Sequence, residues 1–188
     1  MQGLAWHDEG LDDRALVDAV LAGDRDAFNR VVELESGAVL RTCLRVLGRL
    51  HDAEDATQET FVSAFRSLAS YRGDGPLRAW LLRIATRLAV RRATQRPRTA
   101  PIDELPDSRL ADPDADPARS TLLAERDAGL RVAVIGLPDR YREVVALRFF
   151  ADLSLQEIAE TTGRPLNTVK THLRRGLELL RPAIEGHR

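Results

Sequence analysis

"LSLQEIAETTGRPLNTVKTHLRRGLELL", residues Leu153 to Leu180, reads as two helices joined by a tight turn. Ser154 can cap the first helix, Gly163 permits the sharp turn, and Pro165 suits the start of the second helix. Apolar residues then recur at steps of three and four, which places them on one helix face. These residues are Leu166, Val169, Leu173, Leu177 and Leu180. The stretch therefore predicts a helix-turn-helix.

The other side of the second helix is cationic. In a helix-turn-helix this helix lies in the DNA major groove, with residues near its N-terminal half at the base edges. Lysine and arginine can donate to guanine, threonine can contact a thymine methyl, and other arginines contact phosphate. The candidate DNA contacts are Lys170, Thr171, His172, Arg174 and Arg175. A helical hairpin with a solvated basic face is the alternative, but cap, turn and cationic face together favour DNA binding.

Charge is segregated along the chain, although the formal net charge is only −1. Residues 72–98 hold eight arginines and one aspartate, a net of +7, and residues 164–181 hold five basic residues and one glutamate, a net of +4. Between them, residues 99–129 hold eight acids and three arginines, a net of −5. This order suggests two polyanion contacts separated by a segment that avoids polyanions.

Composition excludes several classes of protein. Of the 188 residues, 44% are hydrophobic and 30% are charged, which is typical of a soluble globular protein. No apolar run is long enough for membrane insertion, and the acidic N-terminus does not resemble a secretory signal. The single cysteine, Cys43, allows no internal disulfide and lies in an apolar stretch typical of a core. The lack of a secretory signal and of a disulfide indicates a cytoplasmic protein. The four histidines lack metal-ligand spacing, so we expect neither a metal nor a cofactor.

Helical periodicity dominates the whole chain and predicts an all-α fold. In the N-terminal half we expect four helices: Asp13 to Ala22, Asp24 to about Gly48, one capped by Asp52 and ending near Ser70, and Pro76 to about Gln95. Five of the nine prolines then fall between Pro97 and Pro117 among many acids, which predicts a flexible linker at 99–128. The prediction is two helical domains, 1–98 and 129–188, joined by this linker.

The third expected helix carries an acidic and amide patch. It lies within "HDAEDATQETFVSAFRSL", His51 to Leu68. The residues of the patch are Asp52, Asp55, Gln58 and Glu59. Charge alone favours a solvated face, because surface acids are common.

The fourth expected helix is basic and is preceded by an aromatic loop, in "SYRGDGPLRAWLLRIATRLAVRRATQRPR" from Ser70 to Arg98. Its arginines repeat at four-residue steps, which mildly destabilises an isolated helix and would be relieved by a phosphate backbone. Aromatic rings beside such a stripe suit the stacking of unpaired bases, although Trp80 suits the core equally well. The candidate nucleic-acid contacts are Tyr71, Arg72, Trp80, Arg83, Arg87 and Arg91.

Two segments together resemble a known family. "DAEDATQETFVSAFRSLASYRGDGPLRAWLLRIA" resembles region 2 of the extracytoplasmic-function (group 4, sigma-70 family) sigma factors of bacterial RNA polymerase. "LPDRYREVVALRFFADLSLQEIAETTGRPLNTVKTHLRRGLELL" resembles their region 4. Order, spacing and linker agree from about residue 12 to residue 184.

The resemblance implies a role for each feature. The acidic patch would dock on the β′ clamp helices of core RNA polymerase, in place of the solvated face that charge alone favours. The loop Tyr71 to Gly75 and the following basic helix would open and read the promoter −10 element around a flipped base. The last helix would read the −35 element, and region 4 would meet the β flap. Members of the family are commonly held inactive by an anti-sigma factor, and they are not enzymes.

One departure from the family leaves alternatives open. Arg87 and Arg91 occupy positions where the family often has Asn and Asp, so −10 specificity could be unusual or rely on phosphate contacts. A module that has kept the scaffold but lost promoter use is one alternative. A plain helix-turn-helix regulator is another, although it leaves the helix at 51–68 unexplained. An enzyme is the third, but the chain shows neither a phosphate-binding glycine loop nor a nucleophile–base pairing.

Overall fold

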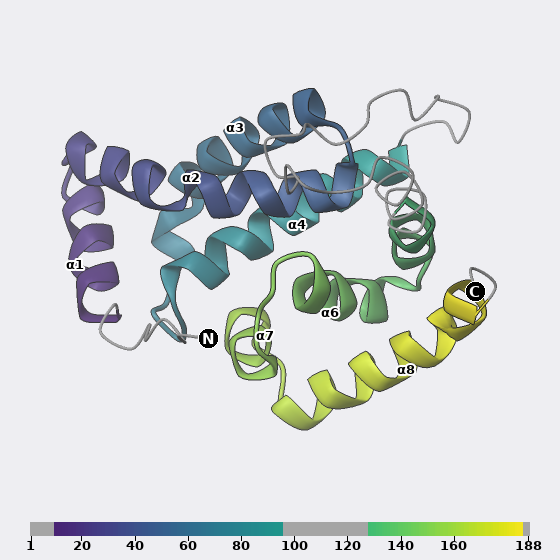
Figure 1. The fold of residues 1–188 in the computed structure, drawn as a ribbon. Helices are drawn as coiled ribbons and strands as arrows, with labels where there is room; N and C mark the ends of the chain where they lie inside the picture. The colour runs from purple at the N-terminus through teal and green to yellow at the C-terminus, as the bar shows by residue number, and fades with distance from the viewer. Residues whose placement is uncertain (1–9, 96–127, 186–188) are drawn as a thin grey trace, which may run out of the picture.

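The computed structural model describes residues 10–95 and 128–185. These residues form helices and connecting turns without a strand among them, which confirms the all-α prediction (Figure 1). The helices are α1 (Gly10–Leu21), α2 (Arg25–Leu47), α3 (Leu50–Ser67), the 3-10 turn η1 (Leu68–Ser70), α4 (Leu77–Gln95), a helical segment at 128–135, α6 (Asp139–Phe149), α7 (Leu155–Thr162) and α8 (Leu166–Glu185). All but the last residue of the predicted linker at 99–128 lies outside the described residues.

The first domain is a bundle of α2, α3 and α4, with α1 packed on α2. Its core holds side chains from all three bundle helices, among them Val39, Ala53 and Leu81. Cys43 is fully buried there, and burial raises the pKa of its thiol to about 11. The prediction that Cys43 is a core residue is therefore confirmed.

Both ends of α2 follow their local sequence. The Asp24 carboxylate accepts hydrogen bonds from the backbone N–H groups of Asp26, at 2.9 Å, and Ala27, at 3.2 Å. Gly48 ends the helix in the left-handed region, with φ of 75°, and its N–H bonds to the Leu44 carbonyl. The bounds predicted for this helix are confirmed.

Two predicted helix starts are wrong. Helix α3 begins at Leu50, so Asp52 lies within the first turn instead of capping it. There its carboxylate still faces the positive end of the helix dipole. Helix α1 begins at Gly10, three residues before the predicted start at Asp13. The Asp13 carboxylate instead accepts a 2.7 Å hydrogen bond from the Leu77 N–H and holds the start of α4.

The second domain packs α6 and α7 against α8. Of the stripe predicted on α8, Val169 and Leu180 are buried, but Leu177 is 37% exposed. Its neighbour Gly176 faces α6 instead, and a Cβ added there would lie 2.6 Å from Val145 Cγ2. At this turn α8 therefore meets α6 through Gly176.

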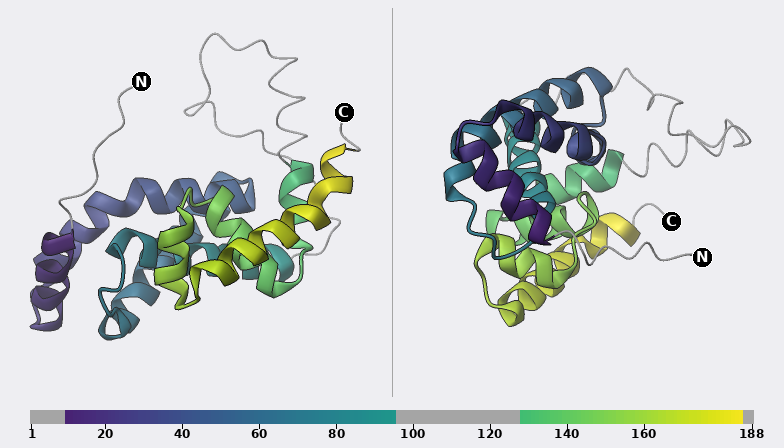
Figure 2. Two further views of the ribbon diagram at one scale, coloured as in Figure 1. Left: turned by 90° about the horizontal axis from the view of Figure 1, so that it is seen from below. Right: turned by 90° about the vertical axis from the view of Figure 1, so that its left-hand side faces the viewer.

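Helix α4 belongs to both cores. It packs on α2 and α3 in its own domain and on α6 and α7 of the second domain. The right-hand view of Figure 2 shows the first domain lying directly against the second. Adjacent residues Leu81 and Leu82, and again Ala85 and Thr86, are therefore all buried. The helix predicted to bind nucleic acid is thus also the contact between the domains.

Candidate nucleic-acid and protein interfaces

The turn between α7 and α8 has the predicted helix-turn-helix geometry. The Ser154 hydroxyl accepts from the Glu157 N–H, and the Glu157 carboxylate accepts from the Ser154 N–H at 2.7 Å, which completes a capping box. Gly163 ends α7 with φ of 67°, a conformation that suits glycine. Both local signals set the direction in which α8 leaves the turn.

Three of the five candidate DNA contacts on α8 lie on its outer side. Lys170 and Arg174 are exposed, and Thr171 is half-buried between them, with its hydroxyl donating to the Asn167 carbonyl at 2.8 Å. Arg174 pairs with Glu178 at 2.6 Å. Asn167, exposed in the first turn, shares this side but was not among the predicted contacts. Its position in the N-terminal half of the helix was the signal that could have found it.

The other two candidates lie toward α6. The His172 ring meets the Tyr141 ring edge to face, with centroids 5.6 Å apart. Its Nδ1 is buried without a hydrogen-bond partner among the described residues, and burial lowers the pKa of His172. A hydrogen bond from Arg175 lowers the pKa of Tyr141. His172 is thereby turned away from the outer side of α8, while Arg175 stays exposed beside Tyr141.

The basic side of α4 borders a cleft. The cleft encloses about 410 Å³ and is lined by Trp80, Arg83, Arg87 and Arg91 of α4. Hydroxyls from the first domain line it too, namely those of Ser63, Ser67 and Ser70, which the sequence did not single out. Arg87 and Arg91 are exposed, whereas Arg83 is half-buried against the second domain. Three guanidiniums beside hydroxyls form a surface suited to a phosphate backbone.

The aromatic loop before α4 is ordered by its own contacts. The Tyr71 and Trp80 rings meet edge to face with centroids 5.7 Å apart, and the Tyr71 hydroxyl donates to the Gly75 carbonyl at 2.6 Å. Burial raises the pKa of Tyr71 to about 12. Trp80 packs against the core and also lines the cleft, so the two interpretations of its ring are compatible. Arg72 is exposed in the loop.

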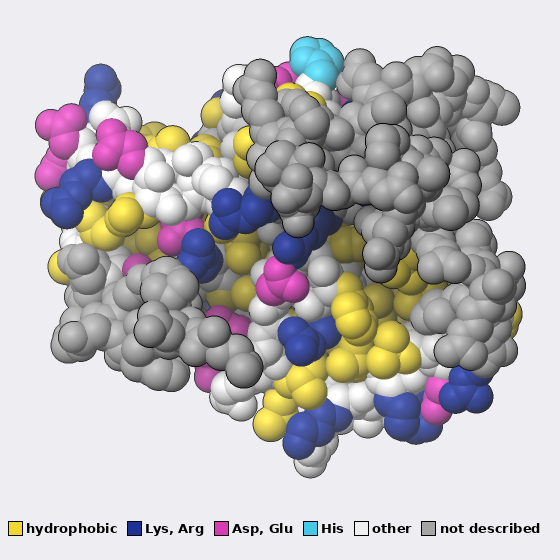
Figure 3. Space-filling view, in the orientation of Figure 1, with side chains coloured by type: hydrophobic (Ala, Val, Ile, Leu, Met, Phe, Trp, Pro, Cys, Tyr) yellow, Lys and Arg dark blue, Asp and Glu magenta, His cyan; other side chains and the backbone are white. Residues whose placement is uncertain are grey.

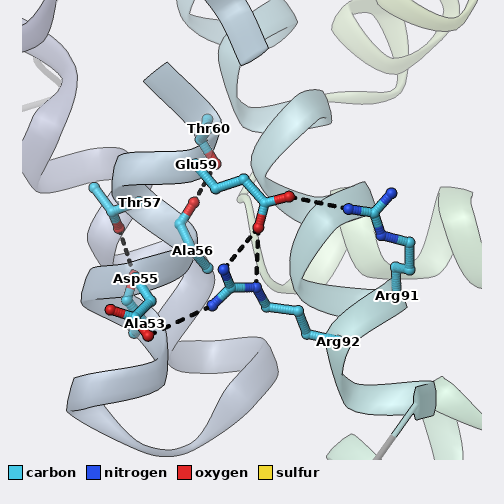
Figure 4. Close-up of polar contacts among 8 residues, drawn as sticks. All are labelled: Ala53, Asp55, Ala56, Thr57, Glu59, Thr60, Arg91 and Arg92. Carbon is cyan, nitrogen blue, oxygen red and sulfur yellow. Dashed lines mark hydrogen bonds and ion pairs between the residues drawn. The ribbon is translucent and has the colours of Figure 1, made fainter. Parts of the chain in front are cut away.

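The acidic patch on α3 is tied to α4. Asp55 and Gln58 are exposed, while Asp52 and Glu59 are half-buried. As Figure 4 shows, Glu59 bonds to two guanidiniums of α4, that of Arg91 at 3.0 Å and that of Arg92 at 2.7 Å and 3.1 Å. Arg92 also lies 3.9 Å from Asp55. The patch and the basic helix therefore form one ion-pair network.

Basic side chains gather on two parts of the surface. Figure 3 shows lysine and arginine side chains where the two domains meet and along α8. In the described part of the chain no helix is long and apolar enough to cross a membrane. Nor do three or more His, Cys, Asp or Glu side chains among those residues form a group that could hold a metal ion.

Comparison with known proteins matches both domains. The model of the family Sigma-70 region 2 matches residues 31–99, and that of Sigma-70, region 4 matches residues 129–180. The ECF RNA polymerase sigma factor SigW of Bacillus subtilis (strain 168) is 33% identical over 177 residues, which span 88% of this chain and 92% of SigW. The chain belongs to the extracytoplasmic-function sigma factors. It binds core RNA polymerase and directs promoter-specific initiation of transcription. The family consists of transcription regulators rather than catalysts.

Solved structures share the fold of this sigma factor. CnrH in complex with the cytosolic domain of CnrY aligns over 93% of this chain and 97% of its own, with a TM-score of 0.63 and 23% identity. The sigma factor RpoE of Bartonella quintana, in complex with the anti-sigma factor NepR, aligns over 86% and 98%, with a TM-score of 0.52 and 19% identity. At these identities the likeness is one of fold.

Proposed function

We propose that the second domain reads the −35 element with the outer side of α8. The observation that carries the proposal is the direction of three side chains: Lys170, Thr171 and Arg174 lie together on the outer side, beyond the capped α7 and the Gly163 turn. Asn167 joins them, because an amide in this position can pair with adenine. His172 and Arg175 support this surface through Tyr141, and exposed Arg175 also reaches phosphate.

The first domain, in this proposal, opens and reads the −10 element. Arg87 and Arg91 would hold the strand phosphates along the cleft, with Arg72 and Arg83 at its loop end. A base turned out of the helix would stack on the Tyr71–Trp80 pair. Arginines at the Asn-like and Asp-like positions make phosphate contacts a larger share of this interaction, and therefore make it sensitive to salt.

The acidic patch is proposed to dock on the β′ clamp helices, and region 4 on the β flap. Asp55 and Gln58 are exposed for direct contact, and Glu59 offers the part of its carboxylate that the arginines leave open. Asp52 stands at the N-terminal end of the same face. We place the chain in the cytoplasm, where the polymerase is, and leave catalysis to the polymerase.

We also propose control by an anti-sigma factor. Support comes from the structural neighbour RpoE, which was solved with the anti-sigma factor NepR. The proposed division remains 1–98 for region 2, 99–128 for the linker and 129–188 for region 4.

Site-specific photocrosslinking in the initiation complex tests the residue assignments. A photoreactive side chain at Lys170 should crosslink to −35 DNA, and one at Arg87 to the −10 non-template strand. A third at Asp55 should crosslink to β′. Arg30, exposed on α2, is the matched control and should crosslink to none of these. Crosslinks from Lys170 to −10 DNA, or from Arg87 to protein alone, would refute the assignments.

A further inference from the structure

Helix α1 lies against the aromatic loop that we assign to the −10 element. The model of Sigma-70 region 2 matches the chain from residue 31 to residue 99, so α1 lies outside the matched part. Helix α1 packs on α2 and contacts η1, and η1 leads directly into the loop Tyr71 to Gly75. Residues of α1 are thus placed beside the loop without belonging to the region that defines the family.

Asp13 of α1 supplies the cap that the chain before α4 lacks. The N–H groups in the first turn of a helix have no partner inside the helix, and a side chain just before the helix usually accepts from them. Gly75 and Pro76 precede α4, and neither has an acceptor in its side chain. The Leu77 N–H instead donates to the Asp13 carboxylate at 2.7 Å. Leu77 is buried, so water is poorly placed to replace this acceptor.

The loop itself is joined end to end and contacted at its middle. The Tyr71 hydroxyl donates to the Gly75 carbonyl at 2.6 Å, which connects the first residue of the loop to the last. Arg14, the residue after Asp13, reaches the middle of the loop, because a Cβ added at Gly73 would lie 3.5 Å from its Nη1. Two adjacent residues of α1 therefore contact the loop at its middle and at its junction with α4.

The same two residues act on the Tyr71 hydroxyl through their charge. Burial is the main reason that the pKa of Tyr71 is raised to about 12. The negative charge of Asp13 raises this pKa further, while the positive charge of Arg14 lowers it. The hydroxyl therefore stays protonated at neutral pH and remains a donor to the Gly75 carbonyl.

The cap at Leu77 also fixes the ring of Trp80. Trp80 lies in the first turn of α4, three residues after Leu77, and its N–H donates to the Pro76 carbonyl at 3.3 Å. Its ring meets that of Tyr71 edge to face, with centroids 5.7 Å apart. A shift of the first turn of α4 would change how the two rings meet. The pair proposed to stack on a flipped base thus depends on the carboxylate of Asp13.

We propose that Asp13 is a positioning residue for reading of the −10 element. Through the Leu77 N–H it holds the loop and the Tyr71–Trp80 pair in the arrangement that receives the flipped base, and it does not touch DNA itself. Rings that are already ordered lose less conformational entropy when the base enters. The inference rests on the proposed function, because that function assigns the loop to the −10 element. A purely structural Asp13 would stabilise the first domain without changing how a base is held.

Three variants separate the positioning role from a structural one. Asp13→Ala removes the acceptor, and Asp13→Asn keeps an acceptor oxygen in the same place. Asp18→Ala, at an exposed position of the same helix, is the matched control. Each full chain is combined with core polymerase and a −10 non-template single strand from a promoter that the wild-type chain uses.

Strands with an abasic site at each position in turn identify the flipped base as the one whose removal costs the most affinity. The quantity measured is the ratio of the affinities for the intact strand and for that abasic strand. This ratio does not depend on the fraction of chain that is folded, so loss of stability alone leaves it unchanged.

We expect Asp13→Ala to lower the ratio about tenfold, the effect of one lost hydrogen bond, while the affinity for core polymerase is unchanged. Asp13→Asn should keep most of the ratio, and Asp18→Ala should keep all of it. In a Trp6→Phe background Trp80 is the only tryptophan, and acrylamide should quench its fluorescence more strongly after Asp13→Ala.

An unchanged ratio or unchanged quenching in Asp13→Ala would overturn the proposal, as would an equal loss in Asp18→Ala. If removal of no base affects binding by the wild-type complex, the assignment of the loop to the −10 element fails. The quenching of Trp80 in the free chain then still decides whether Asp13 holds the ring pair.

Discussion

Glu59 of α3 accepts two hydrogen bonds from the Arg92 guanidinium of α4, at 2.7 Å and 3.1 Å (Figure 4). The first residue belongs to the patch assigned to polymerase docking, and the second follows directly on the arginines assigned to the −10 strand. With Arg91 on the other carboxylate oxygen, the network joins the two surfaces. Docking on Glu59 would compete for Arg91 and Arg92 and leave them freer to meet phosphate.

Glu59→Gln should therefore weaken binding to core polymerase severalfold while the fold persists. Loss of the charge removes a docking carboxylate. The side chains of the internal pairs are 32–59% exposed, so the free energy of unfolding should fall by only about 0.2–1 kcal/mol. Fluorescence anisotropy with labelled chain measures the affinity, and urea unfolding measures stability. Glu54→Gln, exposed on the same helix, is the matched control. Equal losses of affinity in both variants would argue against a specific patch.

Arg87→Ala should impair promoter opening more than polymerase binding. Arg87 is exposed on the cleft side of α4 and forms no ion pair among the described residues, so its removal costs the fold little. Permanganate reactivity of unpaired thymines reports opening, and anisotropy reports binding. Arg30→Ala on α2 should alter neither. Proportionate losses in the two assays for Arg87→Ala would count against a −10 role.

On α8, Lys170→Ala should weaken transcription more than His172→Phe does. Lys170 is exposed on the outer side, whereas His172 packs edge to face on Tyr141, a contact that a phenylalanine ring can keep. If Lys170 reads a base, its loss should weaken DNA binding by about 1–3 kcal/mol. If it contacts phosphate, its loss should lower the slope of log affinity against log salt concentration by about 1. Run-off transcription across a salt series measures both. A larger defect in His172→Phe would reverse this assignment.

Gly176→Ala should destabilise the second domain by about 1–3 kcal/mol through overpacking. The new Cβ would lie 2.6 Å from Val145 Cγ2, inside a fully buried contact. Gly37→Ala is the control: it is exposed within α2, and its Cβ would meet only the tip of the Arg41 side chain. There the substitution should stabilise the helix by about 0.5–1 kcal/mol. Urea unfolding should therefore show a lower free energy of unfolding for Gly176→Ala and a higher one for Gly37→Ala. Changes of the same sign in the two variants would contradict the packing of Gly176 on Val145.

Lowering the pH should remove the contribution of Glu143 to the free energy of unfolding. Burial raises the pKa of this carboxyl, but hydrogen bonds and charge from Arg164 and Arg83 outweigh it and hold the pKa below its usual 4.5. Since the folded pKa is lowered, the stabilisation is full above about pH 4.5 and is lost as the pH falls through the folded value. The difference in unfolding free energy between the wild-type chain and Glu143→Gln should therefore be largest near pH 7 and shrink in acid. A difference that does not change with pH would show that the ion pairs contribute nothing.

Structural features that depend on residues close together in the chain could be predicted from the sequence. The caps at Asp24 and Ser154, the left-handed glycine Gly163 and the ends of α4 all follow from local backbone chemistry. The outward positions of Lys170 and Arg174 follow from helical periodicity. These features specify the helix-turn-helix before any packing is known.

Contacts between distant segments could not be predicted. The hydrogen bond from the Leu77 N–H to the Asp13 carboxylate joins residues 64 positions apart. Nothing in the sequence near Asp13 points to that partner. The approach of Gly176 to Val145 and the pairing of Arg83 with Glu143 depend in the same way on how the helices pack. Periodicity identifies the face of a helix that is buried, but not which element covers it. The contacts between the two domains were therefore found only in the structure.

Run-off transcription tests the central claim most directly. Purified chain is mixed with bacterial core polymerase and a pool of genomic promoter fragments, with core polymerase alone as the control. Discrete new start sites that depend on the chain are the predicted result, and mapping them reveals both promoter elements. A chain that binds the core but yields no start site would instead be a module that has lost promoter use. A folded chain that does not bind an active core at all would contradict its assignment as a working sigma factor.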